Sequence, residues 1–449
     1  MVLLGCGLSM AMMSACELIA GIEEKTAAPD MAGSSSSGVA ASGGGFGGGS
    51  GGSGSSSGGG IGGGTGGGLP QQPINDPSCG PGIPPDMMCS NSPCNPDLFE
   101  NSSCHCGTCD HSCGGPFCGG GTCEPQLISA LEPNIHRLAT NGKRLFFSSH
   151  ATGDFDGKLY SVPLELGQFS NQIVHTQEPM FAIRQVAASC NFVFYAVLDT
   201  AALKSRLQLL PIDNPAQIPA LVLSEDPGDI TDIAVDGKTT YWVHRTDDEK
   251  GSIYMWSEGD AAGKKILSNL RRPYGLAVDS AYLFYGLDSS ADGAKDGHIM
   301  KIPKPTPNGS IDPMVVAENV GRPWGLAVDF SHVYWLDGLT EEVMPMIFEV
   351  RVQRALKGAA PSSNPPQVVS TIEGSAKAHS IAVDGKYIYW SSSSDIMRKS
   401  TANIAGPATV VLDGYKYPNY SANWFVADRH RLYATRTDVM ASVLSWVGK

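Results

Sequence analysis

Seven side chains of mixed chemistry share one position in a repeated sequence pattern, three residues before a small residue. They are His136, Arg184, Thr231, Tyr274, Trp324, His379 and Asn423. Two histidines with an open coordination position are a ligand set that a catalytic divalent metal can use. His136 and His379 therefore indicate one chemistry, a metal-assisted lyase or hydrolase, in which Asn423 would share an arc with them once the repeats close into a ring.

The same position also carries residues that bind without catalysing a reaction. Arg184, Tyr274 and Trp324 belong to the residue types that dominate binding energies at interfaces. The variety of side chains at this position is explained equally well by surface histidines that bind no ligand and by loop variation without function. Non-catalytic binding without a cofactor and metal chemistry in the central channel thus stand as alternatives.

No other catalytic group stands out in the sequence. The stretch from Gly54 to Gly58 matches the G-x-S-x-G nucleophile pattern, but it lies in a Gly/Ser-rich segment with no predicted strand or helix beside it. An aspartate follows the small residue in several repeats, as Asp329 and Asp384 do. Its repetition indicates architecture rather than acid–base catalysis.

The elements that must position these side chains belong to a repeat of seven units. The units align on the small residues Ala139, Ala187, Ala234, Ala277, Ala327, Ala382 and Val426, whose spacings are 48, 47, 43, 50, 55 and 44 residues. A period in the forties with short strands is typical of a β-propeller. We therefore expect an all-β fold over residues 126–449, a seven-bladed β-propeller.

Each unit predicts four strands. In the first strand a small residue such as Ala327 lies between larger ones, as an inner strand crowded by neighbouring blades requires. Asp329 then turns the chain by accepting bonds from nearby backbone N–H groups. The pair Tyr334 and Trp335 ends the second strand and is expected to pack between blades.

The last unit is one strand short. The chain ends after "SVLSWVG", whereas "PQLISALEP", just before the first unit, resembles the outer strand of the other units. We expect this N-terminal strand to complete the last blade. Closure of this kind leaves no open sheet edge.

The first 78 residues predict export and a tether. Residues 1–15 are apolar and uncharged, as in a signal peptide, and are too short to span a bilayer. Met13-Ser14-Ala15-Cys16 resembles a bacterial lipobox, so Cys16 is the expected lipidation site, with Cys6 as the alternative. Residues 16–32 would then form a lipid-anchored N-terminus and residues 33–78 a flexible Gly/Ser-rich linker. We expect a lipoprotein of the bacterial outer membrane or cell surface, or otherwise a secreted protein, that meets the membrane only through its anchor.

Residues 79–123 hold nine of the twelve cysteines and few large apolar residues. Cross-links must replace a core in such a segment, so we expect a small disulfide-rich module, with zinc binding as the alternative. Because nine is odd, Cys190 is a candidate partner that would pin the module to the propeller, unless it is a buried free thiol. The expected disulfide cysteines are Cys79, Cys89, Cys94, Cys104, Cys106, Cys109, Cys113, Cys118, Cys123 and Cys190.

Two phrases of the repeat, "GLAVD" followed by "VYW" and "IAVDGKYIYW", resemble the YWTD and NHL groups of β-propellers over residues 126–449. Those groups usually have six blades, so a six-bladed ring is the alternative to seven. Together with "CELIAGIEE" and "CGTCDHSCGGPFCGGGTCEP", the propeller is similar to a myxobacterial family of predicted secreted proteins and lipoproteins with a Cys-rich segment before the propeller. The resemblance implies fold and location but no established activity.

The formal net charge of −13 and the lack of a Lys/Arg cluster in the sequence argue against nucleic-acid binding. We expect a surface-displayed propeller that recognises an extracellular protein or carbohydrate without catalysing a reaction. The metal-assisted enzyme is the alternative, and a structural envelope protein without a small ligand is a further one.

Overall fold

The structure is a computed structural model of the 449-residue chain. It describes residues 118–119, 122–123, 126–132, 135–151, 155–164, 173–178, 181–199, 201–213, 220–246, 250–288, 295–305, 311–339, 349–372, 378–392, 395–412, 424–428, 431–437 and 442–448. The chain divides into two compact units, residues 1–63 and 64–449, and all described residues belong to the second. The predicted signal peptide, lipidation site and linker lie outside the described residues, as does most of the Cys-rich segment.

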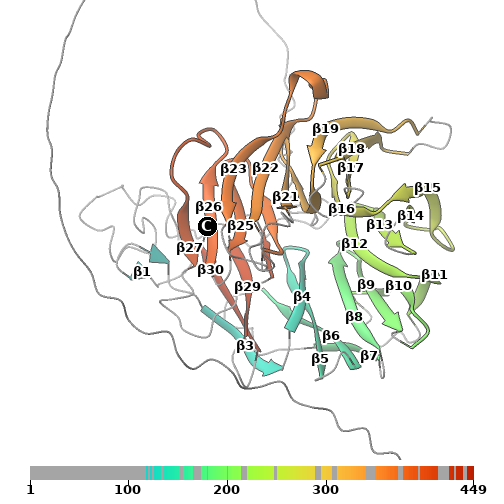
Figure 1. The fold of residues 1–449 in the computed structure, drawn as a ribbon. Coiled ribbons are helices and arrows are strands. Elements are labelled where there is room, and N and C mark those ends of the chain that lie inside the picture. Colours follow the sequence, from blue (N-terminus) through green and yellow to red (C-terminus); the bar gives the residue numbers. More distant parts are fainter. Residues whose placement is uncertain are drawn as a thin grey trace, which may run out of the picture. The chain divides into compact units, whose positions relative to one another are not determined.

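The described residues form seven four-stranded antiparallel sheets arranged around a common centre (Figure 1). Each sheet is one blade. The first four blades contain β4 (Ile135–Thr140), β5 (Arg144–Ala151), β6 (Phe155–Pro163) and β7 (Ile173–Glu178); β8 (Ala182–Ala188), β9 (Phe192–Asp199), β10 (Lys204–Pro211) and β11 (Leu221–Pro227); β12 (Asp229–Asp236), β13 (Thr239–Arg245), β14 (Lys250–Ser257) and β15 (Lys264–Arg271); β16 (Pro273–Val278), β17 (Tyr282–Leu287), β18 (Gly297–Pro303) and β19 (Met314–Val320).

The remaining three blades follow the same plan. They contain β20 (Arg322–Val328), β21 (His332–Leu339), β22 (Glu349–Leu356) and β23 (Gln367–Ile372); β24 (Ile381–Val383), β25 (Tyr387–Ser392), β26 (Asp395–Ser400) and β27 (Thr409–Leu412); and β28 (Phe425–Ala427), β29 (Arg431–Thr437), β30 (Ser442–Gly448) and β3 (Gln126–Glu132). The all-β propeller that the repeat predicts is confirmed.

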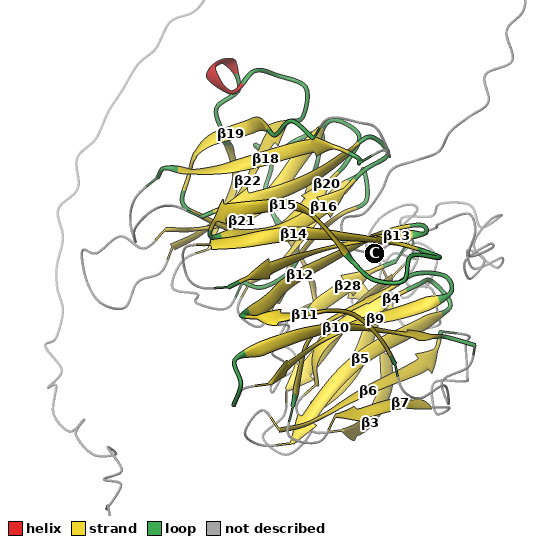
Figure 2. Cartoon of the chain, turned by 90° about the vertical axis from the view of Figure 1, so that its right-hand side faces the viewer, coloured by secondary structure: helices red, strands yellow, loops and turns green. Residues whose placement is uncertain are grey.

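Two small elements do not belong to the blade sheets. A two-stranded sheet pairs β1 (Cys118–Gly119) with β2 (Thr122–Cys123). A single turn of 3-10 helix, η3 (Pro361–Ser363), is drawn red near β19 in Figure 2. Within the described part of the chain, no helix has both the length and the apolar character needed to cross a bilayer.

The ring closes through β3. Six of the sheets consist of strands consecutive in the chain, whereas the seventh combines β28, β29 and β30 with β3, which pairs antiparallel to β30. Tyr433 of this last blade packs in one apolar cluster with Phe147 and Tyr160 of the first blade. The predicted N-terminal closing strand is therefore present, and it completes the seventh four-stranded sheet.

Aromatic pairs on the second strand of six of the seven blades build the cores between blades, and the last blade has Tyr433 alone at this position. On β21, Tyr334 shares an apolar cluster with Trp390 of the next blade, and Trp335 shares another with Phe284 of the preceding blade. All four rings are buried. Burial of rings this large is a main source of stability, so the predicted packing between blades also explains why the pattern recurs.

The repeated aspartates shape the turn after the inner strand in several blades. Asp329 Oδ1 accepts the backbone N–H groups of Ser331 and His332, both at 2.7 Å, and Asp329 Oδ2 accepts the Tyr334 hydroxyl at 2.6 Å. Asp384 makes the same three kinds of bond in the next blade. These carboxylates are thus used in folding, as the repeat predicts.

Candidate functional site

A cavity of about 380 Å³ lies where the inner strands begin, and all seven blades contribute to its lining. Four residues of the predicted ring line it: Thr231, Tyr274, Trp324 and His379. His136 and Arg184 are not among its lining residues, and Asn423 lies outside the described residues. In their blades the cavity is lined instead by the residue that follows each of them, namely Arg137, Gln185 and Trp424.

A β-bulge in the inner strand decides which side chain reaches the cavity. In β8 the pairing with β9 shifts between Ile183 and Gln185, and in β16 the pairing with β17 shifts between Tyr274 and Leu276. A bulge places two residues opposite one, which re-aims the side chains beside it. Taking the residue three positions before the small residue therefore finds the correct end of the inner strand. The side chain that lines the cavity can be the next residue instead.

Glycine explains why the aromatic residues line the cavity in two blades. Gly275 and Gly325 follow Tyr274 and Trp324, and have φ values of +52° and +58°. Glycine adopts this left-handed conformation readily and contributes no side chain. In these blades the lining side chain is therefore the preceding aromatic residue, whereas Arg137 and Gln185 occupy the equivalent place in the first two blades.

Replacement of Gly325 by alanine is expected to destabilise the propeller by about 1–2 kcal/mol, because the left-handed backbone conformation is less favourable by this amount for a residue with a Cβ. The added Cβ would also lie 3.3 Å from Ile381 Cγ2, in the next blade. Thermal denaturation would measure the change. Gly358→Ala is the matched control, because no atom lies within 4 Å of a Cβ there. Equal Tm values for the two variants would contradict the strained turn.

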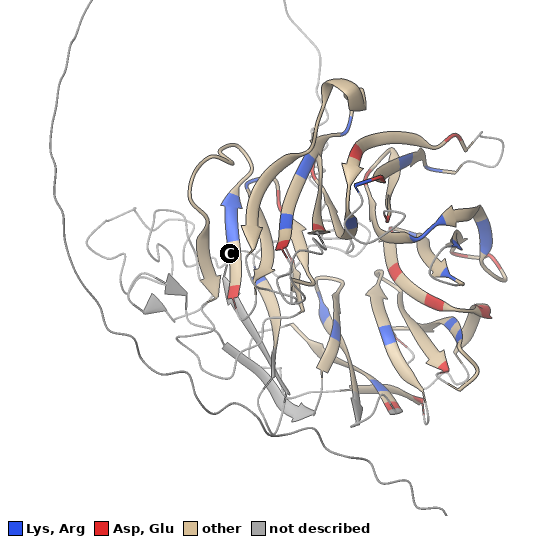
Figure 3. Cartoon of the chain, in the orientation of Figure 1, with Lys and Arg blue, Asp and Glu red and all other residues tan. Residues whose placement is uncertain are grey.

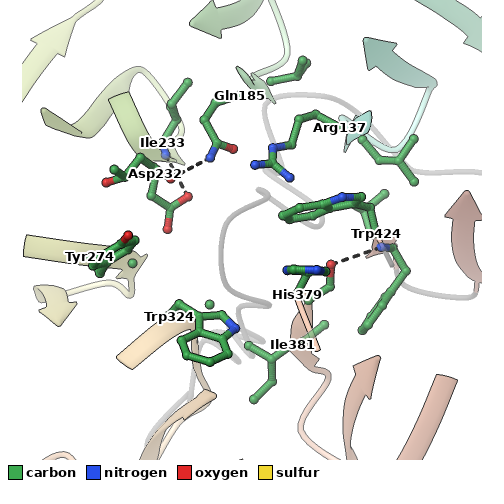
Figure 4. A pocket seen from close by; sticks show the side chains of 18 of the residues that line it. Arg137, Gln185, Asp232, Ile233, Tyr274, Trp324, His379, Ile381 and Trp424 are labelled. Carbon is green, nitrogen blue, oxygen red and sulfur yellow. Dashed lines mark hydrogen bonds between the residues drawn. The ribbon is translucent and has the colours of Figure 1, made fainter. Parts of the chain in front are cut away.

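One wall of the cavity is a stack of three side chains from three blades. The Arg137 guanidinium carbon lies 3.4 Å from the centre of the Trp424 ring, and the His379 ring lies 5.0 Å from that ring at an interplanar angle of 18°. Figure 4 shows Trp424 between Arg137 and His379. Stacking on both faces fixes the indole, and cation–π attraction holds the guanidinium.

Arg137 is charged at neutral pH although it is partly buried. Its Nε donates a hydrogen bond to the backbone oxygen of Arg184 at 2.5 Å. Burial lowers the pKa of Arg137 to about 10, and the nearby Asp232 carboxylate opposes this change. The cavity therefore contains a fixed positive charge.

The opposite wall is polar and is held by backbone bonds. Asp232 accepts the N–H of Ile233 at 2.9 Å through Oδ1 and the N–H of Leu276, in the next blade, at 2.7 Å through Oδ2. Gln185 donates through Nε2 to the backbone oxygen of Thr231 at 2.6 Å. Figure 3 shows the corresponding change of charge, with basic residues on β4 and β8 and acidic residues on β12.

The two predicted aromatic residues of the ring are anchored as well. Trp324 donates from Nε1 to the backbone oxygen of Ala378 at 2.7 Å. The guanidinium carbon of Arg245 lies 4.7 Å from the centre of the Tyr274 ring. Both rings are half-buried, so each presents part of its surface to the cavity.

The described residues do not assemble the predicted metal ligands. Only His379 of the two histidines lines the cavity. Among side chains that the structure describes, no group of three or more His, Cys, Asp or Glu residues could hold a metal ion. The metal-assisted alternative therefore gains no support from this part of the chain.

Cys190 is disulfide-bonded, so it is not a free thiol. It lies in the turn between β8 and β9, at the end of the second blade opposite the cavity. All other cysteines of the sequence stand at or before Cys123. A partner for Cys190 within the Cys-rich module stays a prediction.

Comparison with known proteins supports the fold. No protein-family model matches the chain, and no curated protein matches it significantly. A chain of Kuenenia stuttgartiensis hydrazine synthase aligns over 70% of this chain and 96% of that one, with a TM-score of 0.50 and 13% identity. The β-propeller domain of the Trilobed protease from Pyrococcus furiosus aligns over 70% and 95%, with a TM-score of 0.46 and 8% identity.

A structure from a study of two prolyl endopeptidases also aligns, with a TM-score of 0.48 and 14% identity over 71% of this chain. The alignment covers 47% of the endopeptidase, so this chain matches about half of that protein. At such low identities the likeness extends to the fold alone.

Proposed function

We propose that this protein is a non-catalytic recognition protein whose propeller binds a carbohydrate in the cavity at the start of the inner strands. The observation that carries the proposal is the composition of the lining. Aromatic rings with a surface open to a ligand come from two blades (Tyr274 and Trp324), and planar polar groups come from three others (Arg137, Gln185 and Asp232). Aromatic surface suits the apolar face of a sugar ring, and fixed polar groups suit its hydroxyls.

The size of the cavity favours a small ligand over a protein surface. About 380 Å³ is within the range of pockets that enclose small molecules. A stable protein interface instead needs roughly 800 Å² of mostly convex or flat surface on each partner. A short oligosaccharide, which could enter the cavity with one or two sugar rings, is the better match.

The carboxylate content of the lining argues against sugar hydrolysis. Glycoside hydrolysis generally uses two carboxyl groups on either side of the bond that breaks. Asp232 is the one carboxylate among the lining residues that the structure describes, and both of its oxygens accept backbone N–H groups. Binding without reaction is therefore the function that these contacts support best.

The direction of the chain suits a binding domain tethered through its N-terminus. β3 begins at Gln126, beside Trp446 of β30, and ends at Glu132, beside Ser442. The antiparallel pairing of β30, β29 and β28 places Gln126 at the end of the blade opposite the cavity. The cavity thus faces away from the point where the chain enters the propeller.

Replacement of Tyr274 by alanine is expected to weaken carbohydrate binding about tenfold or more, since an aromatic contact is worth on the order of 1 kcal/mol beyond its buried area. The full chain would be screened on an array of neutral and acidic oligosaccharides. The Kd values for bound sugars would then be measured by calorimetry for the wild type and the variant.

Tyr282→Ala is the matched control. Tyr282 is a half-buried tyrosine of the same blade with a cation, Lys301 Nζ, 4.7 Å from its ring centre, but it does not line the cavity. It should leave the affinity unchanged. Equal losses in the two variants, or a wild type that binds none of the sugars, would refute the proposal.

A further inference from the structure

Arg137 is the charged residue of the cavity lining whose hydrogen-bond donors are not all used within the described part of the protein. Its Nε is used by the backbone oxygen of Arg184, and its plane is fixed against Trp424. Its two terminal nitrogens form no hydrogen bond within the described part of the chain. In Figure 4 the guanidinium group extends from the first blade toward the centre of the lining residues. It is therefore positioned to donate to a ligand.

The other charges of the lining already have partners in the protein. Arg322 donates from Nε to Asp288 Oδ2 at 3.2 Å, and Asp288 is buried. Asp232 is held by two backbone N–H groups, as described above. Of the two arginines that line the cavity, Arg322 is thus paired with a carboxylate, whereas the terminal donors of Arg137 have no such partner among the described residues. An anionic group is what this arrangement attracts.

The geometry favours a carboxylate over a phosphate. The end of a guanidinium group offers two parallel N–H donors, which match the two oxygens of a planar carboxylate. A dianionic phosphate would meet stronger repulsion from Asp232, which lies close enough to influence the charge state of Arg137. A single negative charge experiences less of that repulsion.

We propose that the ligand of this cavity is an acidic oligosaccharide containing a uronic acid, whose carboxylate is bound end-on by Arg137. This inference rests on the proposed function, because the aromatic residues Tyr274 and Trp324 supply the sugar contact. Trp424 sets the orientation of Arg137 and is a positioning residue. The stack thus selects among sugars by charge.

The test compares uronic acids with their methyl esters, which keep the sugar and lose the charge. The probes are trisaccharides of glucuronic, galacturonic, mannuronic and guluronic acid, each as free acid and as methyl ester, titrated into the full chain. At least one acid is expected to bind about tenfold or more tightly than its ester, the value of one charge-assisted bidentate contact. The difference should shrink in high salt, which screens charges.

Arg137→Gln is expected to abolish the preference for the acid, and Arg137→Lys to keep part of it, because lysine retains the charge without the paired donors. Arg398→Gln is the matched control. The guanidinium carbon of Arg398 lies 4.7 Å from the centre of the Tyr387 ring, away from the cavity lining, so its loss should leave the preference intact. Tm values of all variants would verify folding, and Arg137→Lys keeps the test valid if Arg137→Gln unfolds.

The outcomes separate this inference from the function on which it rests. Acids and esters bound equally well, or an acid preference that survives in folded Arg137→Gln or Arg137→Lys without change, would overturn the role of Arg137. Neutral sugars bound with a loss in Tyr274→Ala would meanwhile leave carbohydrate recognition standing. Absence of binding to any sugar of the array would overturn both.

Discussion

Deletion of residues 126–132, which removes β3, is expected to lower the Tm of the whole propeller by on the order of 10 °C. β3 supplies the outer strand of the last blade, and its loss leaves β30 as an unpaired edge. The last blade also packs against the first through Tyr433 and Phe147. A weakened last blade therefore weakens the contact that closes the ring, and instability should spread beyond one strand.

Thermal denaturation combined with hydrogen exchange would check this expectation. Faster exchange is expected in β4 and β5 of the first blade as well as in β29 and β30. A chain that lacks the Gly/Ser-rich residues 33–68 but keeps β3 is the control, and its Tm should equal that of the full chain. Faster exchange confined to β30, at an unchanged Tm, would show that closure contributes little.

The fold could be predicted because each signal in the repeat is local. Asp329 bonds backbone groups two and three residues away, and Tyr334 and Trp335 are adjacent residues that face opposite blades. Turn chemistry and alternation of side chains act within a few residues, so they are visible in a single repeat. The repetition then fixes the number of blades and shows that one strand is missing from the last.

The site could be predicted only in part, because its side chains are chosen by pairing between strands. Thr231, Tyr274, Trp324 and His379 line the cavity as the repeat position suggests, but Arg137 does so in place of His136. The bulge that shifts the register depends on the partner strand, which no single repeat reveals. The available signal was the glycine that follows Tyr274 and Trp324. At the same repeat position the first two blades have Arg137 and Gln185, whose side chains can reach the cavity where a glycine cannot.

The stack could not have been predicted from the sequence. Arg137 and Trp424 come from the first and last blades and meet only because the ring closes. Closure itself was predictable, yet it does not specify which rotamers meet across the junction. The chemistry of the cavity thus depends on the contact between Arg137 and Trp424, which are far apart in the sequence. The same contact couples the candidate site to the stability of the ring.

Replacement of Asp337 by asparagine is expected to stabilise the protein at pH 8 and to have progressively less effect as the pH falls toward 4. Asp337 is only 1% exposed and accepts the N–H of Gly321 at 2.9 Å through Oδ1. Burial, aided by the neighbouring Asp288 carboxylate, raises the pKa of Asp337 from 3.8 to about 7, against the opposing effects of the Gly321 N–H, Arg351 and Lys295.

The direction in which stability changes with pH follows from proton binding. Between the two pKa values the folded protein holds a proton on Asp337 that the unfolded chain has lost, so stability falls as the pH rises from about 4 to 7 and then levels off. The full cost above pH 7 is at most about 4 kcal/mol, at 1.36 kcal/mol for each unit of pKa. Asparagine keeps the acceptor for Gly321 and removes the charge, so it should recover a large part of this cost.

Denaturation of wild type and Asp337→Asn at pH 4.5, 6 and 8 would measure the effect as a difference in Tm at each pH. The comparison cancels the general repulsion of an acidic chain at high pH, which both proteins share. Asp213→Asn, at an exposed position, is the control and should give a difference that is small at every pH. A difference for Asp337→Asn that is equally independent of pH would show that this carboxyl titrates near its ordinary range.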